Sequence, residues 1–317
     1  MKKLILLLMI PALNFGQPLV VEVDQLFQNK QYVMAEQIIS DHVSKNPNDL
    51  RATELLGDAY GHQLQWDKAI ICYKKLVKAD DSNANYHYKY GGALGMKALS
   101  ISKLKALTLI GDMKRSFLKA SELDKTHIDT RWALVELYMQ LPGIIGGSKK
   151  KSLKYADELE QLSKVDGYLA KGYVYEYDNE PELAEAYYKQ AIAVGGSVTC
   201  YEKLTDFYQN QDQPKKAIST IETSYKKHNR NALHYQIGKV CADYNIQLEK
   251  GERCLTSFIE NHSAKDGVPV EWAYFRMAQI FKNKNDKETA LLWINKALSK
   301  RVDFKQALEE KKKILKI

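Results

Sequence analysis

The chain has 317 residues, of which 45% are hydrophobic and 27% are charged, a composition typical of a folded protein and not of a disordered one. The formal net charge of +8 is spread along the chain, and its only basic runs are Lys149 to Lys151 and Lys311 to Lys313. A nucleic-acid binder would cluster basic residues with stacking aromatic residues, so the sequence argues against nucleic acid as a partner. Only 7 prolines occur and good helix formers dominate, which predicts helices throughout and no strand.

The N-terminus has the pattern of a signal peptide. Lys2 and Lys3 precede an apolar run from Leu4 to Ile10, which ends at a proline. This run is shorter than the roughly 20 residues of a membrane-spanning helix, so no permanent span is expected. Cleavage before Gln17 would remove residues 1–16 and leave a mature protein in the periplasm or outside the cell. No cysteine lies near the expected cut, which argues against a lipid anchor.

A short pattern recurs along the rest of the chain. A small residue is followed four positions later by a large one, as in Ala69 and Tyr73. Twelve positions before Ala69 lies a second small residue, Gly57, and nine positions before it lies an aromatic residue, Tyr60. The same spacing occurs in three further segments: Gly172, Tyr175, Ala184 and Tyr188; Thr205, Tyr208, Ala217 and Ile221; and Ala278, Phe281, Ala290 and Ile294.

The pattern resembles the tetratricopeptide repeat, a unit of two antiparallel helices that places small residues where the helices cross. The separation of Ala35 from Ala69 is 34 residues, which is the period of that family. The resemblance implies an all-α, right-handed superhelical solenoid over residues 17–302. About eight repeat units are expected, with starts near residues 16, 50, 84, 128, 165, 198, 231 and 271.

Three segments depart from a plain repeat. In the third unit about ten extra residues, 98–107, lengthen the two helical arms or their connection. In the fourth unit the sequence from Leu141 to Ser148 enlarges the turn between helices; its glycines do not have the order or context of a phosphate-binding loop. Residues 303–317 predict a final capping helix that covers the apolar face of the last unit.

No linear motif for catalysis, for a metal or for a cofactor is present, so the sequence favours a protein that is not an enzyme. The seven histidines are scattered singly, and no carboxylate pair or triad has catalytic spacing. The four cysteines do not form a disulfide framework. Cys241 and Cys254 fall on facing helices and could pair in an oxidising compartment, with separate buried thiols as the alternative.

The resemblance also implies a function, because the first helices of tetratricopeptide units line a concave groove. The expected function is a non-catalytic scaffold that binds a protein or peptide in the periplasm or outside the cell. The first alternative is a structural component of an envelope assembly that acts through its convex face or its ends. The second is an enzyme whose active-site residues come together only in the folded protein. Carried onto this sequence, the family's groove positions are acidic and aromatic, so the partner is expected to carry basic or aromatic side chains. The predicted groove residues are Glu54, Asp58, Tyr88, Trp132, Glu136, Tyr173, Glu176, Tyr177, Glu202 and Asp206.

Overall fold

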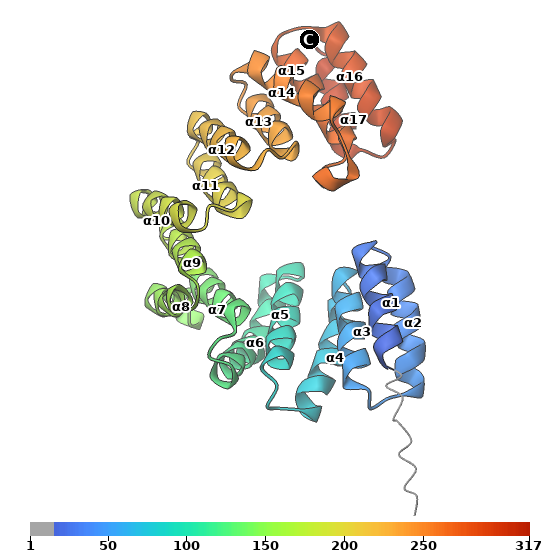
Figure 1. Ribbon diagram of the computed structural model, residues 1–317, viewed down its shortest axis with the longest axis vertical. Helices are drawn as coiled ribbons and strands as arrows, with labels where there is room; N and C mark the ends of the chain where they lie inside the picture. The colour runs from blue at the N-terminus through green and yellow to red at the C-terminus, as the bar shows by residue number, and fades with distance from the viewer. Residues whose placement is uncertain (1–15) are drawn as a thin grey trace, which may run out of the picture. The chain divides into compact units, whose positions relative to one another are not determined.

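The computed structural model describes residues 16–317, and these residues form 17 α-helices and two short 3-10 segments with no strand (Figure 1). The all-helical fold expected from the sequence is therefore confirmed. The predicted signal peptide falls on residues 1–15, which lie outside the described part, and on Gly16, the first residue of α1. None of the helices between residues 16 and 317 combines the length and the apolar character that a bilayer span requires.

The chain divides into two compact units, Met1–Tyr155 and Ala156–Ile317. Within each unit, helices that follow one another in sequence pack as antiparallel pairs. The described helices of the first unit are α1 (Gly16–Gln28), α2 (Tyr32–Lys45), α3 (Leu50–His62), α4 (Trp66–Ala79), α5 (Ala84–Ser100), α6 (Lys103–Leu123), α7 (Ile128–Gln140), the 3-10 segment Gly143–Ile145 and the start of α8 (Lys149–Leu162).

The second unit continues the same arrangement and ends on an unpaired helix. Its elements are the end of α8, α9 (Lys164–Tyr177), α10 (Pro181–Val194), α11 (Val198–Asn210), α12 (Pro214–His228), α13 (Ala232–Asp243), α14 (Leu248–Glu260), the 3-10 segment Ala264–Asp266, α15 (Val270–Asn283), α16 (Lys287–Lys300) and α17 (Lys305–Ile314).

The helices of a pair cross at a glycine in several repeats. A Cβ atom added at Gly57 of α3 would lie 2.6 Å from the ring of Tyr73 in α4, and one added at Gly172 of α9 would lie 2.5 Å from the ring of Tyr188 in α10. These glycines therefore let a large side chain of the second helix touch the backbone of the first. In these two pairs, the recurring small and large residues of the sequence are therefore in contact.

Most pairs make their turn with the same backbone conformation. After the first helix, one non-glycine residue adopts a positive φ between 52° and 60°, in the left-handed region where only a few per cent of such residues occur. This residue is Lys30, Leu64, Asn179, Asp212, Asn245 or Asn285. The described turns of the third and fourth pairs have no such non-glycine residue, and they are the turns at which the sequence departs from the repeat.

The third pair is longer than its neighbours. From the crossing glycine to the turn, α3 continues for five residues beyond Gly57, whereas α5 continues for nine beyond Gly91. In the returning helices, α4 begins seven residues before Tyr73, whereas α6 begins fourteen before Phe117. The extra residues of the third unit therefore lengthen both helices, and the connection is only residues 101–102. We call residues 95–111 the arm.

The turn of the fourth pair is compact despite its length. The segment Gly143–Ile145 forms one turn of 3-10 helix, and the amide of Ser148 donates to the carbonyl of Tyr138 at 2.8 Å. A Cβ atom at Gly147 would lie 1.7 Å from the carbonyl oxygen of Leu141, so no other residue fits at this position without moving the backbone.

The last helix covers the apolar face of the eighth pair. Phe304, Ala307 and Ile314 are fully buried against α15 and α16, and the ring of Phe304 lies 4.5 Å from that of Trp272. Glu310 is 3% exposed and forms ion pairs with Lys282 and Lys313. Without α17, this apolar surface would be open to water.

All four cysteines are free thiols. Cys72, Cys200 and Cys241 are buried and Cys254 is half-buried, and Cys241 and Cys254 do not form a disulfide. Burial raises the pKa of the Cys72 thiol to about 11 and that of Cys241 to about 12.

Candidate functional site

Every predicted groove residue lies on the first helix of a pair. Glu54 and Asp58 lie on α3, Tyr88 on α5, and Trp132 and Glu136 on α7, all in the first unit. The second unit contributes Tyr173, Glu176 and Tyr177 from α9, and Glu202 and Asp206 from α11.

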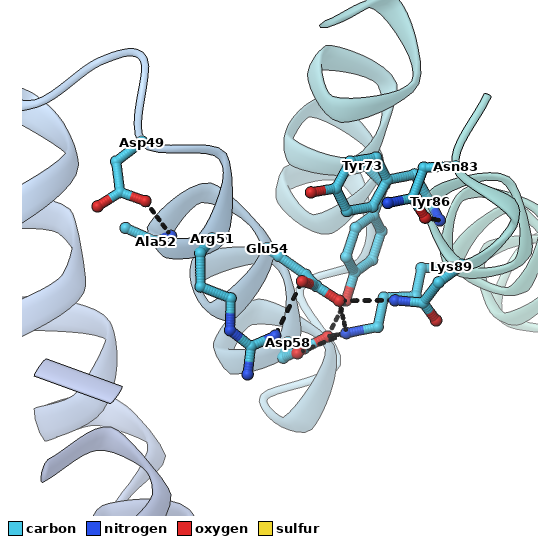
Figure 2. Close-up of polar contacts among 10 residues, drawn as sticks. Asp49, Arg51, Ala52, Glu54, Asp58, Tyr73, Asn83, Tyr86 and Lys89 are labelled. Atoms are coloured by element: carbon cyan, nitrogen blue, oxygen red, sulfur yellow. Dashed lines mark hydrogen bonds and ion pairs between the residues drawn. The ribbon is translucent and has the colours of Figure 1, made fainter. Parts of the chain in front are cut away.

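The two predicted acids of α3 form ion pairs within the first unit (Figure 2). Lys89 of α5 places its Nζ atom 2.7 Å from both Glu54 Oε1 and Asp58 Oδ2. Asp58 Oδ1 also accepts a hydrogen bond from the hydroxyl of Tyr73 at 2.7 Å, and Glu54 pairs with Arg51 at 2.9 Å. The carboxylates thus join one repeat to the next.

These contacts determine how much negative charge α3 leaves available for a partner. Glu54 is only 5% exposed. Burial alone would raise the pKa of its carboxyl, but the ion pairs with Lys89 and Arg51 outweigh burial, and the pKa lies below 4.5. Glu54 is therefore ionised at neutral pH with its charge balanced inside the protein, and only Asp58 remains partly open, with its side chain 23% exposed. The groove prediction considered α3 alone and missed Lys89, which lies 31 residues after Asp58.

The other predicted residues of the first unit are two half-buried aromatic side chains and one exposed carboxylate. Tyr88 is half-buried, with its ring 5.0 Å from that of His127 and 6.2 Å from that of Phe117. Trp132 is also half-buried, and Glu136 is exposed. Burial raises the pKa of Tyr88, and the negative charges of Asp129 and Glu136 raise it further. The Tyr88 hydroxyl therefore stays protonated and can donate a hydrogen bond.

Two tyrosines and a glutamate lie together on α9. The rings of Tyr173 and Tyr177 are 6.0 Å apart, and Tyr177 is 53% exposed. Glu176 accepts hydrogen bonds from Tyr188 Oη at 2.7 Å and from Asn210 Nδ2 at 2.8 Å. Asn210 belongs to α11, so Glu176 links neighbouring repeats, as Glu54 and Asp58 do in the first unit.

Glu202 and Asp206 lie at a hollow of about 120 Å³ in the second unit. A single water needs roughly 10–15 Å³ of comparable volume, so the hollow can take a larger group. We call it the α11–α13 hollow, since it lies among the first helices α11 and α13 and the second helix α12. Its lining residues are Tyr201, Glu202, Thr205 and Asp206 of α11, Ile221 and Ser224 of α12, and Leu233 and Gln236 of α13.

The hollow combines exposed carboxylates with a buried hydroxyl. Glu202 and Asp206 are exposed, whereas Ser224 is only 1% exposed. The Oγ atom of Ser224 is buried and has no hydrogen-bond partner in the described part of the chain. A buried polar atom left unpaired costs free energy, so the packing around Ser224 is not fully satisfied beside the hollow.

The charge of Asp206 is not neutralised as those of Glu54 and Asp58 are. The walls of the hollow shield the carboxyl of this rim residue from part of the water and so raise its pKa. Lys203 and Lys239 act in the opposite direction and Glu176 adds to the rise, but the net shift is upward. A carboxylate that is costly to ionise gains from a cation nearby, so the hollow favours a positively charged group over a neutral one.

The described residues offer no alternative chemistry based on a metal. Nowhere in residues 16–317 do three or more His, Cys, Asp or Glu side chains come together in a way that could hold a metal ion.

A family model described as the tetratricopeptide repeat matches residues 165–194 and 273–299, which coincide with the pairs α9–α10 and α15–α16. Among solved structures, a tetratricopeptide repeat protein from Parabacteroides merdae is similar over 94% of this chain and 98% of its own length, with 14% identity and a TM-score of 0.52. YrrB, described as a tetratricopeptide repeat protein with an unusual peptide-binding site, is 19% identical and covers 62% of this chain and 97% of its own, with a TM-score of 0.42. No curated protein matches the chain.

Proposed function

We propose that this tetratricopeptide-repeat protein is a non-catalytic scaffold that holds an extended segment of a partner protein against the first helices of its pairs. Proteins with this fold are generally scaffolds that bind other proteins. The partner segment carries a lysine or arginine side chain, which enters the α11–α13 hollow.

The hollow is the observation that carries this proposal. It is roomy enough for more than one water, two acidic side chains lie at it, and one of its lining residues is Ser224, whose buried hydroxyl has no hydrogen-bond partner in the described part of the chain. A lysine side chain has a flexible apolar stem and a terminal ammonium with three hydrogen-bond donors. The stem would contact Tyr201, Ile221 and Leu233, while the ammonium donates to Asp206 and Glu202.

Nearby aromatic surfaces support a longer contact along the same unit. Tyr173 and Tyr177 of α9 present adjacent rings, and exposed tyrosines contribute large contact area at interfaces for little loss of side-chain entropy. The proposed partner therefore combines a basic residue for the hollow with aromatic or apolar residues for α9.

The test uses fluorescent peptides with a central lysine in varied sequence, each matched by a peptide with norleucine in its place. Norleucine keeps the stem but removes the charge. We expect the lysine peptides to bind more tightly, and the Asp206→Asn variant to lose about tenfold in affinity, because a hydrogen bond to a charged group contributes roughly 1.5–3 kcal/mol. Anisotropy titration measures both effects.

Asp212→Asn is the matched control. It makes the same chemical change in the same unit, at an exposed turn residue outside the hollow. Its left-handed backbone, with a φ of 53°, is one that asparagine adopts readily. Equal binding of lysine and norleucine peptides, or equal losses in the two variants, would contradict the assignment of the hollow. Binding lost instead through changes on the second helices would favour an assembly role.

We also propose that the protein acts after export, in the periplasm or outside the cell. The motivation is the positively charged start and the short apolar run of residues 1–16. The intact mass of the native protein from its own cells tests this proposal: we expect a chain that begins at or near Gln17. A cytoplasmic species that begins at Met1 would contradict it.

A further inference from the structure

The arm of the third pair extends beyond the crossing that holds the pair together. Counted from the contact of Gly91 with Phe117, α5 is four residues longer and α6 seven residues longer than α3 and α4 are from the equivalent contact of Gly57 with Tyr73. At 1.5 Å per residue, these differences lengthen the arm by about 6 Å on α5 and about 10 Å on α6. The pair α3–α4 packs at its own crossing without this extra length, so the packing of a pair does not by itself explain the arm.

The end of the arm is apolar and open to water. Leu99 is 75% exposed and Leu104 is 80% exposed, one on either side of the connection between the helices. Met96 and Leu107 are 44% and 47% exposed, and each lies three residues farther from the connection, Met96 before Leu99 in α5 and Leu107 after Leu104 in α6. Residues three apart share a face of a helix, so each helix presents an apolar stripe at its free end. Four large apolar side chains within twelve residues exceed the scattered exposure that is normal on a protein surface.

The arm also has a charge of one sign. The thirty residues 82–111 contain no aspartate or glutamate, although the whole chain has 39. Lysines flank the apolar residues: Lys103 and Lys105 at the start of α6 are exposed and form no ion pair with any residue between 16 and 317. Lys97, near the end of α5, pairs with Asp67 of α4 at 2.6 Å. This contact ties the base of the arm to the preceding pair and leaves the other two lysines available.

We propose that the end of the arm inserts into the surface of a membrane that contains anionic lipids. The exposed leucines lie beside lysines, and residues 82–111 contain no acidic residue, so the end of the arm matches a membrane with an apolar interior and negatively charged headgroups. The apolar tip and the lysines together match the two layers of an anionic membrane surface, and an acidic protein partner is an outcome that the test below distinguishes. The site is separate from the α11–α13 hollow and does not depend on it.

Purified full-length protein and protein-free vesicles test this proposal by co-sedimentation. We expect binding to vesicles of phosphatidylcholine and phosphatidylglycerol mixed two to one, much weaker binding to pure phosphatidylcholine, and a decrease as salt is raised. Leu99→Ser with Leu104→Ser should lower partitioning about a hundredfold, or roughly tenfold for each leucine removed from the lipid. Lys103→Gln with Lys105→Gln should lower it about tenfold or more on anionic vesicles and leave the weak binding to neutral ones unchanged.

Val33→Ser with Ile71→Ser is the matched control. These side chains of α2 and α4 are 70% and 69% exposed, so the control removes comparable apolar surface outside the arm. It should bind vesicles as the wild type does, and all variants should keep the wild-type melting temperature. Failure of the wild type to bind anionic vesicles, equal binding to neutral vesicles, or equal losses in arm and control variants would each overturn the proposal. Capture of a partner protein through Leu99 and Leu104 without vesicle binding would also overturn it.

Discussion

Gly91 and Gly92 are neighbours in α5, yet their surroundings differ. A Cβ atom at Gly91 would lie 2.9 Å from two ring carbons of Phe117, whereas one at Gly92 would meet nothing within 4 Å. Replacing either glycine by alanine adds the same methyl group to the same helix, but only the methyl group at position 91 contacts another side chain, Phe117. The comparison isolates the free energy of crowding at the helix crossing.

The magnitudes follow from these two environments. Gly92→Ala should stabilise the pair by about 1 kcal/mol, because alanine has the higher helix propensity. Gly91→Ala gains the same amount but crowds Phe117, which is 5% exposed and cannot move into water. Overpacking of this kind costs about 1–3 kcal/mol, so the two variants should differ by that amount.

Hydrogen exchange followed by mass spectrometry measures the difference locally, on peptides from α5 and α6. Repeat proteins open in parts, so a local probe is more informative here than one global transition. We expect amides of α5 to exchange roughly five- to a hundredfold faster in Gly91→Ala than in Gly92→Ala. Adding Phe117→Leu to Gly91→Ala should restore part of the protection. Equal protection in the two alanine variants would refute the claim that the crossing requires a glycine.

Three further predictions concern charge, the C-terminal helix and the aromatic groove residues. Burial alone would raise the pKa of Glu54, but Lys89 helps hold it below 4.5. The stability that this ion pair contributes should therefore be complete above about pH 4.5, and it should be lost as the pH falls through the lower pKa of the folded state. Urea midpoints measured against pH should show this loss in the wild type and not in Glu54→Gln. Deleting residues 304–317 exposes the face of the eighth pair and should lower the melting temperature or cause association, seen by calorimetry and light scattering; an unchanged monomer would contradict the capping role. Trp132→Ala with Tyr173→Ala should weaken partner binding by about 2 kcal/mol with little change in melting temperature, and unchanged affinity in a folded variant would place the binding surface elsewhere.

The sequence predicted the fold because the repeat depends on short-range spacing. Ala69, Ala184, Ala217 and Ala290 are fully buried, as expected for positions where helices meet. The same spacing showed where the third pair departs from the pattern, since residues were left over between Gly91 and Met113. It could not say whether these residues form longer helices or a longer loop, because the helix propensity of residues 98–107 permits both. In the structure both helices are longer, and residues 101–102 alone connect them.

The sequence predicted less of the candidate site, because a groove depends on contacts between repeats. Glu54 and Asp58 were assigned from their position within one repeat, and Lys89 of the next repeat balances them. Comparing charges one period apart would have found this pairing. Ser224 gave no such signal, since a serine within a helix is ordinarily exposed, and its burial follows from how α11, α12 and α13 pack.

The state of the native thiols has a practical consequence. Three of the four cysteines are buried, and the raised pKa values of Cys72 and Cys241 leave little thiolate at neutral pH. The half-buried Cys254 also has a pKa raised by burial. A maleimide dye should therefore react far faster with a cysteine introduced at an exposed position such as Leu104 than with the native ones. The protein can then carry a single environment-sensitive fluorophore without prior removal of its own cysteines.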